Sequence, residues 1–232
     1  MLETARYEAR QRVRGTIALA VLLGAFALLI IYIFPTIAES SADIDALIES
    51  LPESFREGFG AETYTTIEGF VAAELYQTVW VLLLGLYLAY AAAGTLADDV
   101  ESGRLYLVLA APVSRKRVAF EKFLSLAVPI VTLNLTMPLV VFGGTIAIDY
   151  PLDPSSLLVV HALSIPYLLV CGGLGLLLSA TLNRGDTAQR AAIALVFLLF
   201  LVDSVTLGTD FEWLGAVSPT RYIDPTEVLL HE

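Results

Sequence analysis

The chain alternates between long apolar stretches and shorter polar connections. A membrane-spanning helix needs roughly 17–25 largely apolar residues, and five stretches meet this requirement. They are residues 16–34, 71–96, 123–148, 157–182 and 191–207. Each must be helical within lipid, because a helix satisfies its backbone polar groups internally. The pattern therefore predicts an all-α, polytopic membrane helical bundle with five spans, forming a single transmembrane domain over residues 1–232.

Basic residues in the connections predict which way the chain crosses the membrane. Eleven of the 13 Lys and Arg residues lie in the N-terminal segment 1–14, in the connection 98–122 and in the loop after the fourth stretch. The other side carries only Arg56 and Arg221. Because basic residues accumulate on the cytoplasmic side, we expect a multi-pass protein of the cell membrane with a cytoplasmic N-terminus.

The first span is predicted to end at Pro35, and the acidic segment 36–70 then lies outside. This segment has one apolar stripe at helical spacing. The stripe residues are Ile44, Leu47, Ile48, Leu51, Phe55 and Phe59. Because proline interrupts a helix, Pro52 divides the segment into two predicted helices. These helices either cover the mouth of the bundle as a lid or lie at the lipid surface.

The tail, residues 208–232, begins outside if the five spans are correct. No later stretch is long enough to cross the membrane again, so the chain is predicted to end externally. The run "SPTRYIDPTEVLLHE" is typical of a loop followed by the start of another helix. We therefore expect that a sixth span has been lost by truncation.

Composition agrees with a membrane protein and adds a hypothesis about its source. The chain is 57% hydrophobic and 16% charged, with a mean hydropathy of +0.76, whereas soluble domains are about 45–50% apolar and about 25% charged. Its net charge is -11, and Lys116 and Lys122 are its only lysines. Acid-rich loops with little lysine suit very high salt, so a halophilic archaeal source is one hypothesis. Ordinary compositional drift is the alternative.

Polar residues inside the predicted spans need an explanation. An ionisable side chain at the bilayer centre costs about 2.5–3.5 kcal/mol on insertion scales. Glu74 and Asp203 lie nearer the outer ends of their spans than the middle. They either sit at the interface with access to water or line an outward-facing cavity. Gln77 and Asn134 are further candidates for lining a cavity, and with Thr136 they can also hydrogen-bond between helices.

Small residues and prolines predict how the spans pack. The runs "CGGLG" at 171–175 and "AYAAAG" at 89–94 let neighbouring helices approach closely. Pro129 and Pro138 should kink the third span, and Pro166 should kink the fourth. These features predict a tight bundle without pointing to a particular ligand.

The chain carries no sequence motif for enzymatic chemistry. It has no G-x-x-x-x-G-K-[ST] segment that would cradle ATP phosphates, and no G-x-S-x-G or H-E-x-x-H pattern. His161 and His231 are far apart, Cys171 is the only cysteine, and no cluster has metal-ligand spacing. We therefore expect no enzymatic activity, metal site or bound cofactor in this chain.

The connection "DDVESGRLYLVLAAPVSRKRVAFEK", residues 98–122, is longer and more patterned than a plain loop needs. Gly103 can bend the chain, and residues 104–111 form a short apolar helix. Pro112 stops this helix, because proline disfavours helical geometry in the residue before it. Ser114 is an N-cap candidate for a second helix that runs into the third span.

The basic cluster after this N-cap is placed against the helix dipole. Arg115, Lys116 and Arg117 lie in a first helical turn, where the dipole disfavours cations. Anionic lipid headgroups or an acidic protein surface would explain the placement. Simple positive-inside anchoring explains the cluster too, but it does not explain the acidic "DDVE" and the short helix that precede it.

The same connection resembles the signature loop of type 2 permeases of ATP-binding-cassette (ABC) transporters. The shared pattern is acidic–Glu–Ser–Gly–x–Leu–x–x–x–Leu–x–x–Pro–Val–Ser–Arg, and Arg104 stands where the family often has Thr. The basic segment "ARYEARQRVRG", the large loop after the first span and "SPTRYIDP" extend the resemblance over nearly the whole chain. The matching residues are Glu101, Ser102, Gly103, Leu105, Leu109, Pro112, Val113, Ser114, Arg115 and Lys122.

The resemblance implies a permease subunit with six spans that pairs with a second permease copy and binds two cytoplasmic ABC ATPase subunits. Residues 1–14 would be an elbow helix on the membrane surface, and residues 98–122 would hold the coupling helix that docks on the ATPase. ATP and Mg²⁺ would belong to the ATPase subunit, and we expect no nucleic-acid partner. Glu101 and Arg104 would be polar partners of the ATPase. The implied ATPase contacts are Asp98, Asp99, Glu101, Ser102, Gly103, Arg104, Leu105, Leu109, Pro112, Ser114 and Arg115.

Two other functions stay open at this point. A membrane scaffold or accessory protein could bind an ATPase without moving a substrate, and a missing sixth span would favour that function. A secondary carrier would usually place ionisable side chains near mid-membrane, where these spans are almost uncharged. A permease subunit that couples ATP hydrolysis to substrate movement is therefore the leading hypothesis.

Overall fold

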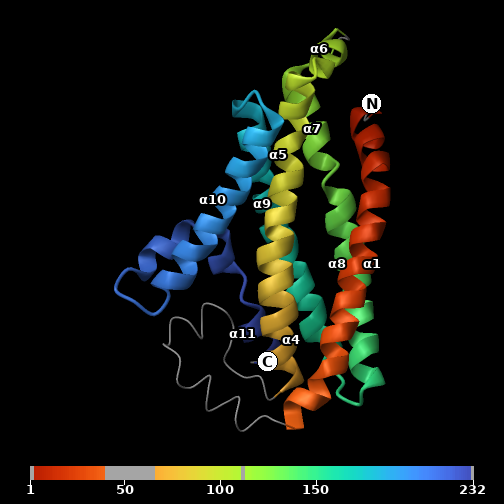
Figure 1. Ribbon diagram of the computed structural model, residues 1–232, viewed down its shortest axis with the longest axis vertical. Helices are drawn as coiled ribbons and strands as arrows, with labels where there is room; N and C mark the ends of the chain where they lie inside the picture. Colours follow the sequence, from red (N-terminus) through yellow and green to blue (C-terminus); the bar gives the residue numbers. More distant parts are fainter. Residues whose placement is uncertain (1–2, 40–65, 111–112, 231–232) are drawn as a thin grey trace.

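The computed structural model describes residues 3–39, 66–110 and 113–230, and every regular element in these ranges is a helix (Figure 1). The long helices lie side by side in one elongated bundle, so the predicted all-α architecture is confirmed. In chain order the elements are α1 (Glu3–Glu39), α4 (Ile67–Val71), η1 (Ala72–Leu84), α5 (Gly85–Glu101), α6 (Arg104–Leu109), α7 (Arg115–Leu124), α8 (Ala127–Ala147), α9 (Pro154–Thr181), α10 (Gly185–Thr206), η2 (Glu212–Val217), η3 (Pro219–Tyr222) and α11 (Pro225–Leu230).

Five helical segments in the described ranges are long and apolar enough to cross a membrane, as the hydrophobic pattern predicts. Each begins or ends beyond the predicted span. Apolar sequence marks only the part that lies in lipid, whereas backbone hydrogen bonding can continue a helix into water. The segments are Arg6–Glu39, Ile67–Glu101, Arg115–Ala147, Pro154–Thr181 and Gly185–Thr206.

The first span is one continuous helix that differs from its predicted form at both ends. α1 passes through Pro35 and ends at Glu39, so Pro35 does not end the helix. Proline removes one backbone donor, but its φ is compatible with a helix, and the last turn continues at the cost of one hydrogen bond. Residues 3–14 are the first turns of α1, and no break separates them from the span as the implied elbow would require.

The second span combines α4, η1 and α5 in one rod. Thr66 caps its start, with Oγ1 accepting a hydrogen bond from the backbone N of Gly69 at 3.2 Å. The 13 residues of η1 are wound as a π-helix. Thr78 Oγ1 donates to the carbonyl oxygen of Ala73, five residues earlier, at 3.0 Å. π-Helical turns are rare and concentrate at functional sites, and this one carries Glu74 and Gln77.

The third span is divided between α7 and α8. The backbone N of Leu126 donates to the carbonyl oxygen of Phe123 at 3.0 Å, which is a tighter turn than an α-helix makes. The division places Pro129 in the first turn of α8, where its missing N–H needs no partner. The break in the third span lies just before Pro129, in agreement with the kink predicted from this proline. Pro138 and Pro166 lie inside α8 and α9.

The middle of the bundle is packed most closely where α5 meets α9. A Cβ added at Gly175 would lie 2.1 Å from the carbonyl oxygen of Ala89, so only glycine fits there. A Cβ at Gly85 would lie 2.5 Å from the hydroxyl oxygen of Tyr167. These contacts confirm that the glycines of "CGGLG" and the alanines of "AYAAAG" bring two spans together.

Side-chain hydroxyl groups also connect α9 to the backbone of the second span. Ser179 Oγ accepts hydrogen bonds from the backbone N atoms of Leu96 and Ala97 at 2.9 and 3.0 Å. The Tyr167 hydroxyl donates to the carbonyl oxygen of Val81, inside the π-helix, at 2.7 Å. All these atoms are buried, where an unpaired polar group is costly, so the bonds fix the register of the two spans.

The tail after α10 folds back along the bundle through η2 and η3. It ends in α11, which packs against α4, η1 and α9. Pro225, Thr226 and Leu229 are buried in this contact. The tail therefore belongs to the packed structure and closes the end of the bundle that lies away from α6 (Figure 1).

Most of the acidic segment 36–70 lies outside the described residues. Its last part, from Ile67, forms the start of the second span, and α1 extends into its first residues as far as Glu39. Pro52 and the apolar stripe fall within residues 40–65, so the two helices and their lid role stay predictions.

Candidate functional site

α6 lies at the extreme end of the bundle, beyond the packed helices (Figure 1). This end, called the α6 end below, also holds the first turns of α1 and the start of α10. The side chains of Arg104 and Tyr106 face solvent, and Tyr106 is 72% exposed. Leu105 and Leu109 are half-buried. Another protein could contact this exposed helix without disturbing the bundle core.

A tight turn at Gly103 directs α6 away from α5. Gly103 has φ +74, a conformation that side chains disfavour. Ser102 Oγ donates to the carbonyl oxygen of Asp98 at 2.6 Å and accepts from Arg104 Nε at 3.0 Å. The Ser-Gly pair of the predicted signature thus builds the turn itself. Pro112 of the same signature lies outside the described residues.

Ser114 begins the next helix as predicted. Its Oγ accepts a hydrogen bond from the backbone N of Arg117 at 3.3 Å, which confirms it as the N-cap of α7. Arg115 and Lys116 are exposed in the first turn of α7. Arg117 Nε contacts Glu121 Oε1 at 2.8 Å, so this third cation has an acidic partner one turn along the same helix.

Two acidic residues before the turn make contacts inside the chain. Asp99 is buried, and its Oδ1 and Oδ2 lie 3.0 Å from Arg104 Nε and 2.7 Å from Lys122 Nζ. Glu101 Oε2 accepts from the backbone N of Gly185 at 2.9 Å, at the N-terminus of α10, where the helix dipole favours a carboxylate. Asp99 and Glu101 therefore hold helices together at the α6 end.

Asp98 occupies the contact between α5 and α10. A Cβ added at Gly185 would lie 1.6 Å from Asp98 Oδ1, and one added at Gly94 would lie 2.9 Å from Oδ2 and 2.6 Å from Gln189 Nε2. Glycine at both positions leaves the room that this carboxylate and amide occupy. Asp98 is half-buried as a result.

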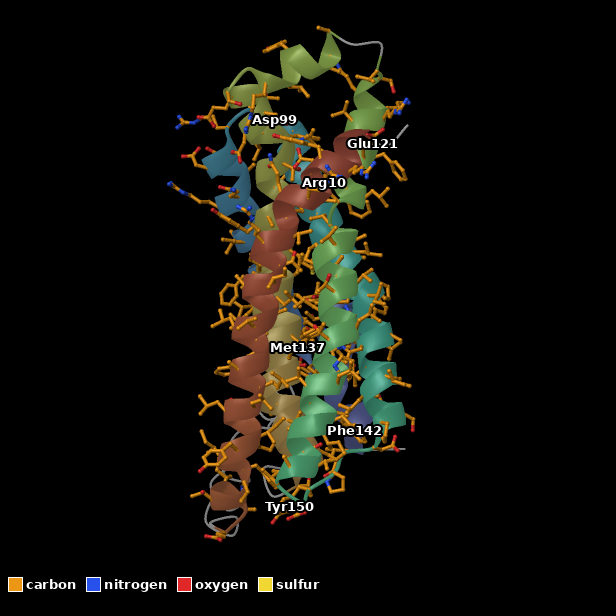
Figure 2. The ribbon with its side chains drawn as sticks, turned by 90° about the vertical axis from the view of Figure 1, so that its right-hand side faces the viewer. Arg10, Asp99, Glu121, Met137, Phe142 and Tyr150 are labelled. Carbon is orange, nitrogen blue, oxygen red and sulfur yellow. The ribbon has the colours of Figure 1, made fainter. Side chains whose placement is uncertain are left out.

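Lys122 is at the centre of a charged cluster that the sequence did not reveal. Its side chain is 3% exposed, and its Nζ lies 2.6 Å from Glu8 Oε1 as well as beside Asp99. Figure 2 shows Asp99 and Glu121 at this end of the bundle with Arg10 of α1, far from Tyr150 at the other end. The buried residues beside it are Val118, Glu121 and Ser125. Because two of these three are polar, no apolar stripe in the sequence marked Lys122 as buried.

A second charged cluster lies toward the opposite end, between α10 and the tail. Arg221 contacts Glu212, and its Nη1 lies 3.7 Å from Asp203 Oδ1. Thr220 Oγ1 donates to Asp203 Oδ2 at 2.6 Å. A cavity of about 240 Å³ adjoins these residues, and Gln77 also lines it. Arg221 entered the sequence-based prediction only in the count of basic residues on each side of the membrane. In the structure it is the partner of Asp203.

The other two predicted cavity residues lie elsewhere. Glu74 is half-buried on η1, and Asn134 is buried on α8, where its Nδ2 donates to the carbonyl oxygen of Ile130 at 2.8 Å. Neither lines the cavity that Gln77 and Asp203 share. Thr136 Oγ1 donates within its own helix, to the carbonyl oxygen of Thr132 at 2.9 Å.

A buried hydrogen-bond network centred on His161 was also missed. Its Nδ1 lies 3.2 Å from Asn134 Oδ1, and its Nε2 lies 3.1 Å from the Tyr76 hydroxyl. Because Asn134 Oδ1 can only accept, Nδ1 carries the proton and Nε2 accepts from Tyr76. The Trp80 ring stands edge-on to the imidazole, with centroids 4.7 Å apart. This network ties η1, α8 and α9 together.

These features define a membrane-embedded helical protein with an exposed helix at one end. Comparison with family models gives a match to the ABC-2 family transporter protein model over residues 2–221. The chain therefore belongs to the ABC-2 transporter family, whose members are membrane permease components of ABC transporters. Searches of curated proteins and of solved structures found no match.

Proposed function

We propose that this chain is the permease subunit that couples ATP hydrolysis by a separate ABC ATPase to substrate movement across the cell membrane. One observation carries the proposal: α6 projects from the bundle end with exposed Arg104 and Tyr106, on a turn that Gly103 sets. Family membership supports an ATPase partner. In this assignment ATP and Mg²⁺ bind the ATPase, and the α6 end with the N-terminus faces the cytoplasm.

The ATPase contact is assigned to the exposed residues of the connection. Arg104 and Tyr106 on α6, with Ser102, Ser114 and Arg115 beside it, are accessible to a partner. Leu105 and Leu109 are half-buried on the same helix. The contact is supported from inside the chain by three acidic residues, Asp98, Asp99 and Glu101. They hold α5, α6 and α10 in place and do not themselves form the exposed surface. Movement of α6 by the ATPase changes the bundle only if ATP binding favours one of two arrangements of the permease over the other.

The permease is proposed to act as a pair, with substrate passing along surfaces that the bundle presents to a second copy. The cavity shared by Gln77 and Asp203 is assigned to the outer part of this path. An ionisable group in a membrane span is expensive unless it pairs, and Asp203 lies 3.7 Å from Arg221, which lines the same cavity.

The test is a pull-down and transport assay with the ABC ATPase subunits of the source organism. Tyr106→Ala should reduce copurification of the ATPase about tenfold or more, since this side chain is 72% exposed and its loss leaves the core intact. Tyr32→Ala is the matched control, because Tyr32 is 75% exposed on α1 and lies toward the opposite end. Unchanged copurification of the α6 variant would refute the contact, and ATPase binding without transport would favour a scaffold.

A further inference from the structure

A continuous series of charge contacts crosses the α6 end and joins four helices. Arg104 of α6 lies 3.0 Å from Asp99 of α5, and Asp99 lies 2.7 Å from Lys122 of α7. Lys122 lies 2.6 Å from Glu8 of α1. These four residues, the Lys122 cluster, connect the exposed helix to the first turns of α1.

Burial changes along the cluster from the outside inward. The Arg104 side chain is 65% exposed, Asp99 is 13% exposed and Lys122 is 3% exposed. Glu8, at the α1 end, is 20% exposed. A buried ammonium group needs its carboxylate partners, because losing one leaves an uncompensated charge in a poorly solvated place. A displacement of Asp99 should therefore carry Lys122, and with it Glu8.

The space around the cluster leaves room for such movement. A cavity of about 600 Å³ lies between α1, α5 and the start of α10, and all four residues of the cluster line it together with Tyr7 and Gln189. Open space and charged side chains, and not a dry apolar contact, therefore separate the first turns of α1 from α5 here. Arg12 Nε donates to Ser125 Oγ at 3.0 Å, so α1 follows α7 at a second point.

We propose that the Lys122 cluster transmits displacement of α6 to the first turns of α1, with Lys122 and Glu8 as positioning residues. The inference rests on the proposed function, in which the ATPase displaces α6. It adds that the first turns of α1 move with α6 because the charges join them. Buried ion pairs add little net stability compared with apolar packing, so an orienting role accounts better for their presence.

The test is a double-variant cycle read by amide hydrogen exchange of residues 3–14 in the full chain, purified in lipid nanodiscs. Glu8→Gln removes the ion pair between Lys122 and α1 and leaves Lys122 paired with Asp99. Arg104→Gln removes the ion pair between α6 and Asp99. Arg104→Gln should speed exchange about threefold and Glu8→Gln about tenfold. The double variant should match Glu8→Gln alone, because the signal from α6 no longer reaches α1.

The matched control is Glu39→Gln, the same substitution at the other end of α1, where the side chain is exposed. It should leave exchange of residues 3–14 unchanged and preserve the response to Arg104→Gln. Multiplied effects in the Arg104→Gln/Glu8→Gln double variant would overturn the proposal, because a purely structural contribution from each residue predicts independent effects. No response of residues 3–14 to Arg104→Gln would overturn it as well.

The exchange cycle and the ATPase pull-down fail independently. The cycle uses the chain alone, so a missing ATPase partner would sink the proposed function and leave the measured link standing. Conversely, ATPase binding with multiplied exchange effects would retain the proposed function and remove the cluster as its transmission route.

Discussion

The middle of the bundle and its α6 end are held together by opposite means. In the middle, α5 and α9 approach until the carbonyl oxygen of Ala89 occupies the place of a side chain at Gly175. At the α6 end, Lys122 and its partners bring helices together beside a cavity of about 600 Å³. In a closely packed contact, a change in side-chain volume displaces the neighbouring helix. Charged side chains beside a cavity have room to change position.

The difference indicates where the molecule is rigid and where it can respond. A packed glycine contact has one workable geometry, so α5 and α9 should move as one body. The Lys122 cluster lies at the end of that body, where α6 and the first turns of α1 meet it. Two predictions test this division and a third tests an exposed helix cap outside both regions, from the largest expected effect to the smallest.

Gly175→Leu should prevent stable folding. Its Cβ would meet backbone atoms of Ala89, which have no flexible end that could move aside, and overpacking should cost about 3 kcal/mol or more. Size-exclusion chromatography and thermal unfolding in detergent measure the loss. Gly143→Leu is the matched control, because a Cβ at Gly143 of α8 meets nothing within 4 Å. If both variants are equally stable, the close contact of α5 and α9 is not what holds the middle.

Lys122→Met should cost about 3 kcal/mol, because it removes the buried cation that lies between the carboxylates of Glu8 and Asp99. Thermal unfolding measures the loss. The triple variant Glu8→Gln/Asp99→Asn/Lys122→Met should recover most of the stability, since it removes the unpaired charges too. A triple variant that stays as unstable as Lys122→Met would show that packing, and not charge, holds the α6 end.

Asp153→Asn should have the smallest effect, at the exposed start of α9. The hydroxyl of Ser155 and the backbone N of Ser156 donate to the carboxylate and lower the pKa of Asp153. A depressed pKa means that the carboxylate stabilises the fold above the ordinary aspartate pKa of about 3.9 and loses this effect as pH falls through the lower folded value. Melting temperature against pH should therefore be slightly flatter in the variant at acid pH, and identical curves would contradict the assignment.

The spans and the local signals of the α6 end could be predicted, because each depends on neighbouring residues. Apolar runs identified five membrane helices, and Ser114 was recognised as an N-cap from its place before a helix. Glycine in "CGGLG" indicated close approach. The continuation of α1 through Pro35 was not predicted. Proline removes one backbone hydrogen bond, but the last turn of a helix can still form around it.

The site residues that were missed all depend on partners far along the chain. Glu8 and Lys122 are separated by 114 residues, and Tyr76 and His161 by 85. The sequence carries no local mark of such pairs, since either partner alone is typical of an exposed or packing residue. The π-helical winding of η1 also had no local signal, and it accompanies bonds from Tyr167 and His161 of a different helix.

Local order along the chain was enough to establish a helical membrane protein, its five spans and a polar connection with two short helices, because hydrophobicity, caps and turns act over a few residues. Which charges are exposed and which hold the chain together depended on the packed bundle. Asp99 and Glu101 look alike beside Arg104 in the sequence, and only folding brings Lys122 and the start of α10 to them. The role of a charged side chain depends on which residue it contacts, and the tertiary structure determines that contact.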